Sequence, residues 1–293
     1  MIKKIKNVGF IGTGIIGLPM AKNLFDAGYK IHTFARNNKT HLKLKKAGLI
    51  VEKDLCKFYK SIDILILAVS DTIDVKNILT GKNGMANFHI KPSIVLDMST
   101  ICPIETIEIS KFLKKYDISL VDAPVSGGEI GAINGNLSIM LGGDKKIIKK
   151  VMPLLKILGD KITHIGNSGA GQVAKACNQI IVAQTINAVS EAFMISDSFK
   201  VNKDNVRKAL LGGFANSKIL EIHGERMLKN SYKPGFKTKL HAKDLRIAKN
   251  ISLKKKLSLK GTNLVNKNMN ICNNSGHGEK DSSAYYLTIK KQK

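Results

Sequence analysis

The chain has 293 residues, of which 43% are hydrophobic, enough to form the core of one large domain or two ordinary ones. The first apolar run reaches a glycine too soon for a signal-peptide core or a membrane span, so we expect a soluble, cytosolic protein. A formal net charge of +26 would by itself favour a polyanionic partner, but the lysines are spread along the chain without a nucleic-acid-binding motif. We therefore expect neither nucleic acid nor a membrane as a partner.

The metal-binding residue types show no metal-site spacing. The four cysteines are widely separated and form no CxxC pair, and the seven histidines form no HExxH pair. The sequence therefore predicts no metal site.

The first half of the chain alternates short strand-like runs with amphipathic stretches. The runs span residues 8–12, 30–34, 63–69, 93–98, 119–125 and 137–141. Residues 64–69 are wholly apolar, as expected for a strand that is covered on both faces. This pattern predicts an α/β fold with a doubly wound, largely parallel sheet.

The second half contains no convincing strand after Gly166. Residues 170–200 read as one long helix, which at about 1.5 Å per residue would be long enough to connect two lobes. A helix over 252–273 carries adjacent lysines at its start, which would repel one another. We predict a sheet domain over 1–165 and an all-helical domain over 166–293, joined by the long helix.

A glycine motif of the form GxGxxG follows the first strand and opens a helix. In this setting Gly12 permits a tight turn, Gly14 lets the backbone approach a pyrophosphate, and Gly17 allows helix and strand to pack closely. The helix N-terminus then faces the phosphates. The motif predicts a Rossmann-type dinucleotide site, although a structural glycine turn would look similar.

The end of the second predicted strand bears on cofactor choice. An acidic residue there would bind both ribose hydroxyls of NAD, but the chain has Arg36, which can pair with a 2′-phosphate. We therefore expect NADP(H) to be preferred, with NAD(H) possible. The alternative is that Arg36 is a solvated surface residue.

Two further segments carry candidate site residues. Ser126, Gly127 and Gly128 leave a strand into a glycine-rich loop whose hydroxyl and amides could hold a carboxylate, or simply form a turn. In the long helix, Asn178 and Gln179 lie three and four residues after Lys175 and so share its face. A lysine desolvated beside another cation can act as acid or base. The alternative is an ordinary surface lysine.

Taken together, these segments closely resemble the β-hydroxyacid dehydrogenase (3-hydroxyisobutyrate dehydrogenase) family over nearly the whole chain. The resemblance rests on GFIGTGIIGLPMAKNL at 9–24, DMST at 97–100, DAPVSGGEIGAINGNLSIMLGGD at 122–144 and GAGQVAKACNQIIVAQTINAVSEA at 169–192. The segments NQIIVA at 178–183, GGFANSKILEIHGERM at 212–227 and KPGFKTKLHAKDL at 233–245 most resemble the branch that reduces tartronate semialdehyde to glycerate. The closing residues 281–284 resemble the family's DxSA motif.

The resemblance implies an oxidoreductase with its active site between a Rossmann domain and a helical domain, within a homo-oligomer, either a dimer or a tetramer. It implies that Lys175 is the catalytic lysine, that Ser126, Gly127 and Gly128 hold the substrate carboxylate, and that Asn178 and Gln179 also contact substrate. Contacts with the cofactor, or in part with substrate, are expected from Gly12, Gly14, Ile15, Ile16, Gly17, Arg36, Val69, Thr100, Phe236 and Lys243.

Other functions remain open at this point. The same site could serve 3-hydroxyisobutyrate, succinic semialdehyde or glyoxylate. The 6-phosphogluconate dehydrogenases expect a His-Asn pair where this chain has Cys177 and Asn178, which argues against that activity. A non-catalytic member that binds nucleic acid through its positive surface would be a different class of protein, and the retained Lys175 argues against it.

Overall fold

The computed structural model describes residues 5–35 and 37–291. These residues form two compact units, an N-terminal unit of Met1–Lys175 and a C-terminal unit of Ala176–Lys293. The division falls within one continuous helix, α8 (Ala170–Ser198). Each unit has its own hydrophobic core.

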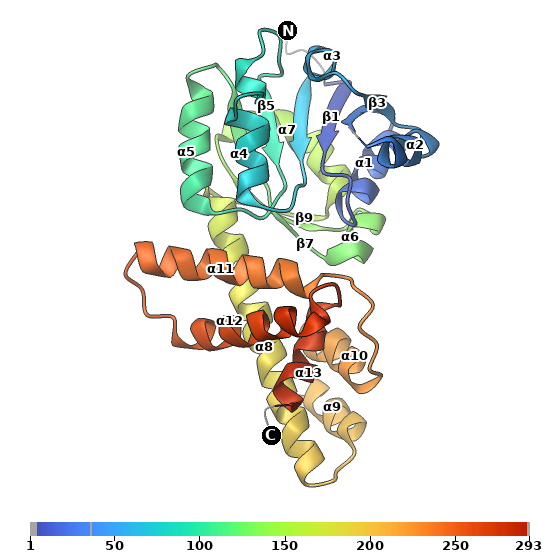
Figure 1. The fold of residues 1–293 in the computed structure, drawn as a ribbon, viewed down its shortest axis with the longest axis vertical. Coiled ribbons are helices and arrows are strands. Elements are labelled where there is room, and N and C mark those ends of the chain that lie inside the picture. The colour runs from blue at the N-terminus through green and yellow to red at the C-terminus, as the bar shows by residue number, and fades with distance from the viewer. Residues whose placement is uncertain (1–4, 36, 292–293) are drawn as a thin grey trace. The chain divides into compact units, whose positions relative to one another are not determined.

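The N-terminal unit is built on one sheet with the order β3-β2-β1-β4-β5-β6-β8-β7, and β9 pairs with β8 (Figure 1). The pairs from β3 through β6 are parallel, whereas β8 runs antiparallel to β6 and β7. The predicted doubly wound parallel sheet is therefore confirmed, with an antiparallel extension at one side. The strands are β1 (Asn7–Ile11), β2 (Lys30–Phe34), β3 (Ile50–Glu52), β4 (Ile64–Leu67), β5 (Ile94–Asp97), β6 (Ser119–Asp122), β7 (Val125–Ser126), β8 (Ser138–Gly142) and β9 (Lys161–Gly166).

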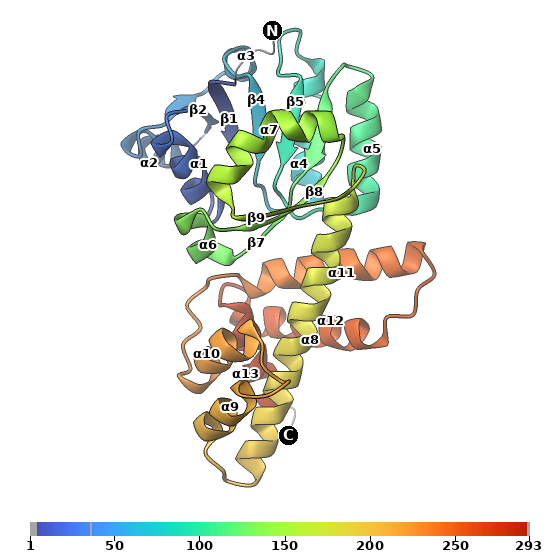
Figure 2. The same cartoon turned by 180° about the vertical axis from the view of Figure 1, so that it is seen from behind.

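Helices cover both faces of this sheet. Strand β4 is buried along its whole length, and because side chains alternate across a strand, Ile64 and Ile66 enter one core while Leu65 and Leu67 enter the other. Helices α4 (Thr72–Thr80) and α5 (Pro103–Lys114) lie over one face in Figure 1. Helices α1 (Gly17–Asp26) and α7 (Lys145–Leu158) lie over the other face in Figure 2.

The shorter elements of this unit complete the crossovers between strands. They are α2 (Asn38–Lys46), α3 (Leu55–Lys60), α6 (Gly128–Asn134) and the 3-10 turn η1 (Met85–Asn87).

Three strands were not anticipated from the sequence. Strands β3 and β7 are too short to produce a periodic signal, and β9 is largely exposed, so its residues do not alternate between apolar and polar. The run predicted as one strand over 119–125 is instead two strands, since β6 ends at Asp122 and β7 begins at Val125. Pro124 lies in the break and has no N–H for a ladder.

The described part of the C-terminal unit is helical. Its core joins Phe193 of α8 to side chains of the later helices, including Leu245, Met269 and Tyr285. The helices after α8 are α9 (Lys203–Leu211), η2 (Ile219–His223), α10 (Gly224–Leu228), α11 (Thr238–Lys254), α12 (Lys260–Cys272), η3 (Asn273–His277), η4 (Ser282–Ala284) and α13 (Tyr285–Lys290). No helix among the described residues is long and apolar enough to cross a membrane.

One helix prediction in this unit was wrong. Residues 252–273 do not form a single helix, because α11 ends at Lys254 and α12 begins at Lys260. Lys256 has a φ of 54°, a left-handed conformation that an α-helix does not accommodate. The lysine run lies at this turn, where its charges are exposed to water.

The start of α8 is attached to the sheet by the carboxylate of Asp122, which is fully buried at the end of β6. Asp122 accepts hydrogen bonds from the backbone N–H groups of Gly169, at 2.7 Å, and Gln172, at 3.1 Å. Burial raises the pKa of Asp122, and the backbone hydrogen bonds oppose this rise. The carboxylate thus satisfies amides that the first turn of a helix would otherwise leave unpaired.

The space around Asp122 depends on glycine at position 142. A Cβ atom on Gly142 would lie 2.5 Å from both carboxylate oxygens of Asp122. Because Asp122 is held by α8, it cannot move aside without losing its hydrogen bonds. We expect Gly142→Ala to lower the free energy of unfolding by about 1 to 3 kcal/mol, the usual cost of overpacking a core. Thermal and urea denaturation would measure it.

Gly213→Ala is the matched control, because a Cβ atom there would meet nothing within 4 Å. Equal stability losses for the two variants would contradict the packing argument.

Candidate functional site

The glycine motif forms a tight loop between β1 and α1. Gly12 has a φ of 103°, and a Cβ atom there would collide with the carbonyl oxygen of Ala68. A Cβ atom on Gly17 would collide with the carbonyl oxygen of Gly12, so α1 packs directly on the loop. Gly14, in contrast, has nothing within 4 Å of its Cβ position, which leaves its backbone open to a bound group. Each glycine therefore meets the requirement that a dinucleotide loop places on it.

The sheet order places this loop at a switch point. Strand β1 lies between β2 and β4. The chain adds β2 and β3 on one side of β1, and then adds β4, β5 and β6 on the other side. Ligands of open α/β sheets bind outside the carboxyl ends of the strands at such a point. Ile15 and Ile16 lie in the same loop, and Ile16 immediately precedes α1 without a side-chain cap. Arg36, predicted to contact a 2′-phosphate, lies outside the described residues.

Two more predicted cofactor residues lie at the same edge of the sheet. Val69 follows β4, and its N–H donates to the hydroxyl of Ser99 at 3.0 Å. Thr100 is the residue after Ser99 in the segment that follows β5. The structure therefore brings the glycine loop and the segments that carry Val69 and Thr100 to adjacent strand ends.

The predicted carboxylate loop lies at the start of α6. Ser126 ends β7, whereas Gly127 and Gly128 have φ values of 138° and 64°, which side-chain-bearing residues rarely adopt. Helix α6 is attached to α1, because the side-chain amide of Asn23 donates to the carbonyl oxygen of Ala132 at 2.8 Å. The loop is thereby connected to the helix that begins in the glycine motif.

Lys175 lies in the second turn of α8, and 7% of its surface is exposed. Three residues earlier, the buried Gln172 accepts from the N–H of Ile101 at 3.1 Å and donates to the carbonyl oxygen of Ser99 at 2.7 Å. The beginning of α8 is therefore attached both to β6, through Asp122, and to the segment after β5, through Gln172.

In the C-terminal unit, Asn178, Gln179 and Lys243 lie in one polar cluster centred on Asp244. The side-chain amide of Asn178 donates to Gln179 at 2.8 Å, and that of Gln179 donates to Asp244 at 2.6 Å. The ammonium group of Lys243 lies 2.8 Å from the other oxygen of Asp244. Asp244 thus holds an amide and a cation side by side.

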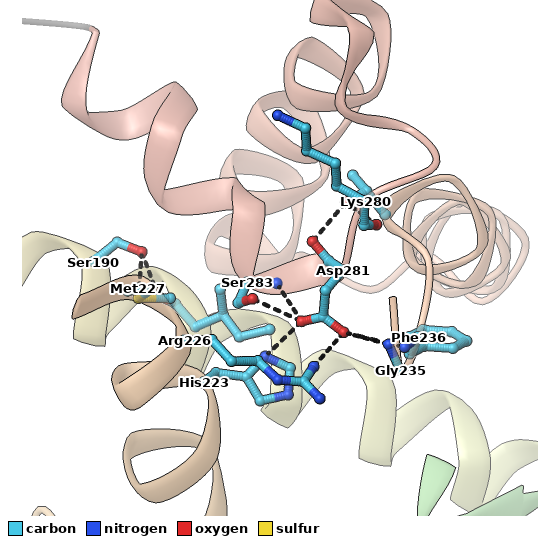
Figure 3. Close-up of polar contacts among 11 residues, drawn as sticks. Ser190, His223, Arg226, Met227, Gly235, Phe236, Lys280, Asp281 and Ser283 are labelled. Carbon is cyan, nitrogen blue, oxygen red and sulfur yellow. Dashed lines mark hydrogen bonds and ion pairs between the residues drawn. The ribbon is translucent and has the colours of Figure 1, made fainter. Parts of the chain in front are cut away.

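Phe236 is connected to the same region through His241. The two rings lie with their centroids 5.5 Å apart, and His241 contacts the carbonyl oxygen of Gln179 at 3.3 Å through Nε2. The Phe236 backbone has a separate anchor, the buried carboxylate of Asp281 (Figure 3).

Asp281 is the centre of a second cluster in this unit. One of its oxygens accepts from the N–H groups of Gly235 and Phe236, at 3.0 and 3.1 Å, and also pairs with Arg226 at 2.5 Å. The other oxygen accepts from the hydroxyl of Ser283 at 2.7 Å and lies 3.6 Å from Nδ1 of His223 (Figure 3). The carboxylate therefore fixes the loop that carries Phe236.

The charge state of this cluster follows from its surroundings. Burial by itself would raise the pKa of Asp281, but His223, Ser283 and Arg226 outweigh burial and hold that pKa below its ordinary value. Burial lowers the pKa of His223 more than Asp281 raises it. At neutral pH Arg226 is therefore the cation that stabilises the carboxylate, and His223 adds its charge only once it is protonated at acidic pH.

Two family models match nearly the whole chain. Residues 7–166 match the NAD binding domain of 6-phosphogluconate dehydrogenase, and residues 169–289 match the NAD-binding domain of NADP-dependent 3-hydroxyisobutyrate dehydrogenase. The chain belongs to the 3-hydroxyisobutyrate dehydrogenase family. As a member of that family it is a nicotinamide-dependent oxidoreductase that acts on CH–OH groups, which confirms the predicted class of enzyme and of cofactor.

Individual family members support this assignment. The chain is 42% identical to the 2-hydroxy-3-oxopropionate reductase of Escherichia coli over 94% of both chains. It is 32% identical to the NAD-dependent L-serine dehydrogenase of Pseudomonas aeruginosa, over 83% of this chain and 84% of that protein. The solved structure of the Mycobacterium tuberculosis 3-hydroxyisobutyrate dehydrogenase with L-serine has a TM-score of 0.88 at 25% identity, and covers 98% of this chain and 99% of that one.

For several residues that hold these clusters together, the sequence predicted no role. Asp122, Gln172 and Asp281 all lie inside the motifs that carry the family resemblance, and Asp244 directly follows Lys243. Their position inside these motifs was the one feature of the sequence that could have marked them as important. Their partners are distant in sequence, 46 residues away for Asp281 and Gly235 and 47 for Asp122 and Gly169.

Because the pKa of Asp281 is lowered in the folded protein, the free energy of unfolding depends on pH in a direction that can be predicted. A carboxyl group whose pKa is lower in the folded state contributes stability above its unfolded pKa of about 3.9 and loses it as the pH falls through the folded value. We expect Asp281→Asn to cost about 3 kcal/mol at pH 7, because Arg226 loses its partner. The difference in melting temperature from wild type should shrink below about pH 4.

Glu279→Gln is the matched control, since Glu279 pairs with Lys237 and Lys239 at an exposed site. Exposed pairs contribute little stability, so this variant should melt close to wild type at every pH. A melting difference for Asp281→Asn that stays constant down to pH 3 would rule out the charge argument.

Proposed function

We propose that this chain reduces tartronate semialdehyde, 2-hydroxy-3-oxopropanoate, to glycerate with NADPH. The observation that carries the proposal is the 42% identity to 2-hydroxy-3-oxopropionate reductase over 94% of both chains. The two family matches, over residues 7–166 and 169–289, span every candidate site residue.

Lys175 is the proposed acid and base. When bound, the nicotinamide supplies a hydride to the aldehyde carbon, and negative charge develops on the carbonyl oxygen. The ammonium group of Lys175 donates a hydrogen bond to that oxygen and then its proton, which yields the alcohol. In the reverse direction, neutral Lys175 accepts the hydroxyl proton. Gln172 and Asp122 support this role, because they fix the turn of α8 that precedes Lys175.

The substrate carboxylate is assigned to the loop before α6. The hydroxyl of Ser126 and the N–H groups of Gly127 and Gly128 supply donors suited to an anion. Among the amides, Asn178 is the better candidate for a substrate contact. Gln179 is engaged at both ends by Asn178 and Asp244, so its role in this proposal is to orient Asn178.

The cofactor is assigned to the switch point of the sheet. Gly12, Gly14 and Gly17, with Ile15 and Ile16, form the phosphate-binding loop, and the open space at Gly14 fits a pyrophosphate. Val69, Thr100, Phe236 and Lys243 complete the proposed contacts with cofactor or substrate. The ammonium group of Lys243 is paired with the carboxylate of Asp244, so the neighbouring negative charge partly offsets its positive charge.

The proposal also covers the location, the oligomeric state and the two domains of the protein. We propose that it acts in the cytosol as a homo-oligomer, a dimer or a tetramer, and that residues 1–165 and 166–293 are its cofactor and substrate domains. The corresponding family models match residues 7–166 and 169–289.

A second candidate is oxidation of a 3-hydroxy acid by the same site. It is favoured by the relative named as an L-serine dehydrogenase and by the related structure described with L-serine. Oxidation of L-serine or 3-hydroxyisobutyrate, together with reduction of glyoxylate and succinic semialdehyde, would be measured beside tartronate semialdehyde. The highest kcat/KM identifies the substrate class.

Replacement of Lys175 tests the mechanism. We expect Lys175→Ala to lower kcat for tartronate semialdehyde by about 100- to 10,000-fold, because general acid catalysis is lost. Lys175→Arg should also be impaired, since a guanidinium group keeps the charge but does not release a proton near neutral pH. Lys150→Ala, on the exposed surface of α7, is the control. Near-normal turnover by Lys175→Ala would disprove the role of this lysine.

Replacement of Arg36 tests the cofactor preference. A charged hydrogen bond to the 2′-phosphate is worth about 1.5 to 3 kcal/mol, so Arg36→Ala should lower kcat/KM for NADPH by about 10- to 100-fold. The value for NADH should change little. The measurement is the ratio of kcat/KM for NADPH to kcat/KM for NADH, in wild type and in the variant. An unchanged ratio would show that Arg36 is a surface residue.

A further inference from the structure

The side chain of Gln172 makes two contacts with the backbone of the segment that carries Thr100. It is 1% exposed in the first turn of α8. Its oxygen accepts from the N–H of Ile101 at 3.1 Å, and its nitrogen donates to the carbonyl oxygen of Ser99 at 2.7 Å. Both ends of the carboxamide are therefore used on one three-residue segment.

That segment and that helix turn carry two of the proposed site residues. Thr100 lies between the two residues that Gln172 holds, and Lys175 lies three residues after Gln172 in α8, about 4.5 Å further along the helix axis. The segment is also joined to the strand end of β4, because Ser99 accepts from the N–H of Val69. Gln172 is thus the side chain that connects the Lys175 helix to the segment after β5.

We propose that Gln172 is a positioning residue, which holds the Thr100 segment and the Lys175 turn of α8 in one fixed register. The proposal rests on the function proposed above for Lys175. A shift of the two segments against each other would leave the phosphate-binding loop intact but would displace the proton donor, Lys175, from the carbonyl oxygen that it protonates. A displacement of about 1 Å can cost about 100-fold in rate.

The chemistry of the site explains why glutamine is required there. The segment presents one donor, the N–H of Ile101, and one acceptor, the carbonyl oxygen of Ser99, so its partner must offer one acceptor and one donor. An ionised glutamate offers acceptors only. It would also face the carboxylate of Asp122, which accepts from the backbone of residue 172, and that of Asp97, which accepts from the N–H of Ser99 at 3.0 Å.

A protonated glutamic acid, in contrast, restores the donor. Burial and the two neighbouring carboxylates favour that neutral form, while Lys175, three residues further along α8, is the cation on the same helix that opposes it. Gln172→Glu should therefore behave as a variant whose activity recovers when its own side chain is protonated.

The test compares Gln172→Glu and Gln172→Met with wild type, on whichever hydroxy acid or semialdehyde wild type turns over fastest. We expect both variants to lower kcat about 10- to 100-fold at pH 8. The ratio of variant to wild-type kcat should rise toward 1 for Gln172→Glu as the pH falls to about 5.5, but stay low for Gln172→Met. The Kd for NADPH, from fluorescence titration, should change less than kcat does in either variant, because the glycine loop that would bind the pyrophosphate is not attached to Gln172.

Gln184→Glu is the matched control, since Gln184 is an exposed glutamine on the same helix. It should show wild-type kcat at every pH. The melting temperature of each variant, measured in the assay buffer, separates misplacement from unfolding.

The proposal is overturned if Gln172→Glu and Gln172→Met both keep wild-type kcat, or if Gln172→Glu shows no recovery at low pH. It is also overturned if the loss of kcat in either variant matches the fraction of unfolded protein. The proposed function fails separately, if wild type reduces tartronate semialdehyde more slowly than another substrate. In that case the comparison of the Gln172 variants continues on the better substrate.

Discussion

The buried carboxylate of Asp122 is the interaction on which the arrangement of the N-terminal unit depends. It lies at the end of β6 and accepts from two backbone amides at the start of α8, so one side chain joins the strand directly to the backbone of the helix. The glycines at 142 and 171 leave room for it, because a Cβ atom at either position would lie within 3 Å of a carboxylate oxygen. The space that this aspartate needs is thus one reason for glycine at these two positions, and at Gly171 a Cβ atom would also collide with the carbonyl oxygen of Met140.

The C-terminal unit uses a buried aspartate in a similar way but in a different electrostatic setting. Asp281 also accepts from two backbone amides, yet it lies beside Arg226, whereas only backbone amides lower the pKa of Asp122. Burial therefore dominates at Asp122 and raises its pKa, while at Asp281 the neighbouring cations and hydrogen-bond donors outweigh burial and lower the pKa. The two carboxylates contribute to stability with opposite pH dependence.

Local features of the site were accessible from the sequence because they depend on neighbouring residues. A positive φ at Gly12 and the close packing at Gly17 are requirements of a turn between a strand and a helix, and the glycine spacing states them directly. The buried strand β4 was equally clear, since a short apolar run between amphipathic stretches is typical of a strand covered on both faces. Elements that depend on pairing partners, such as the two-residue β7, left no such pattern.

The sequence by itself determined the class of fold, the family, the glycine loop and the long helix that carries Lys175, because periodicity, glycine spacing and motif identity are local properties of a chain. Only the tertiary structure decided what Asp122, Gln172, Asp244 and Asp281 do. The distant hydrogen-bond partners of their side chains are backbone amides, carbonyls and side chains that lie between 45 and 73 residues away. A glutamine in a helix looks the same in sequence whether it faces water or holds a strand end, and burial alone distinguishes the two.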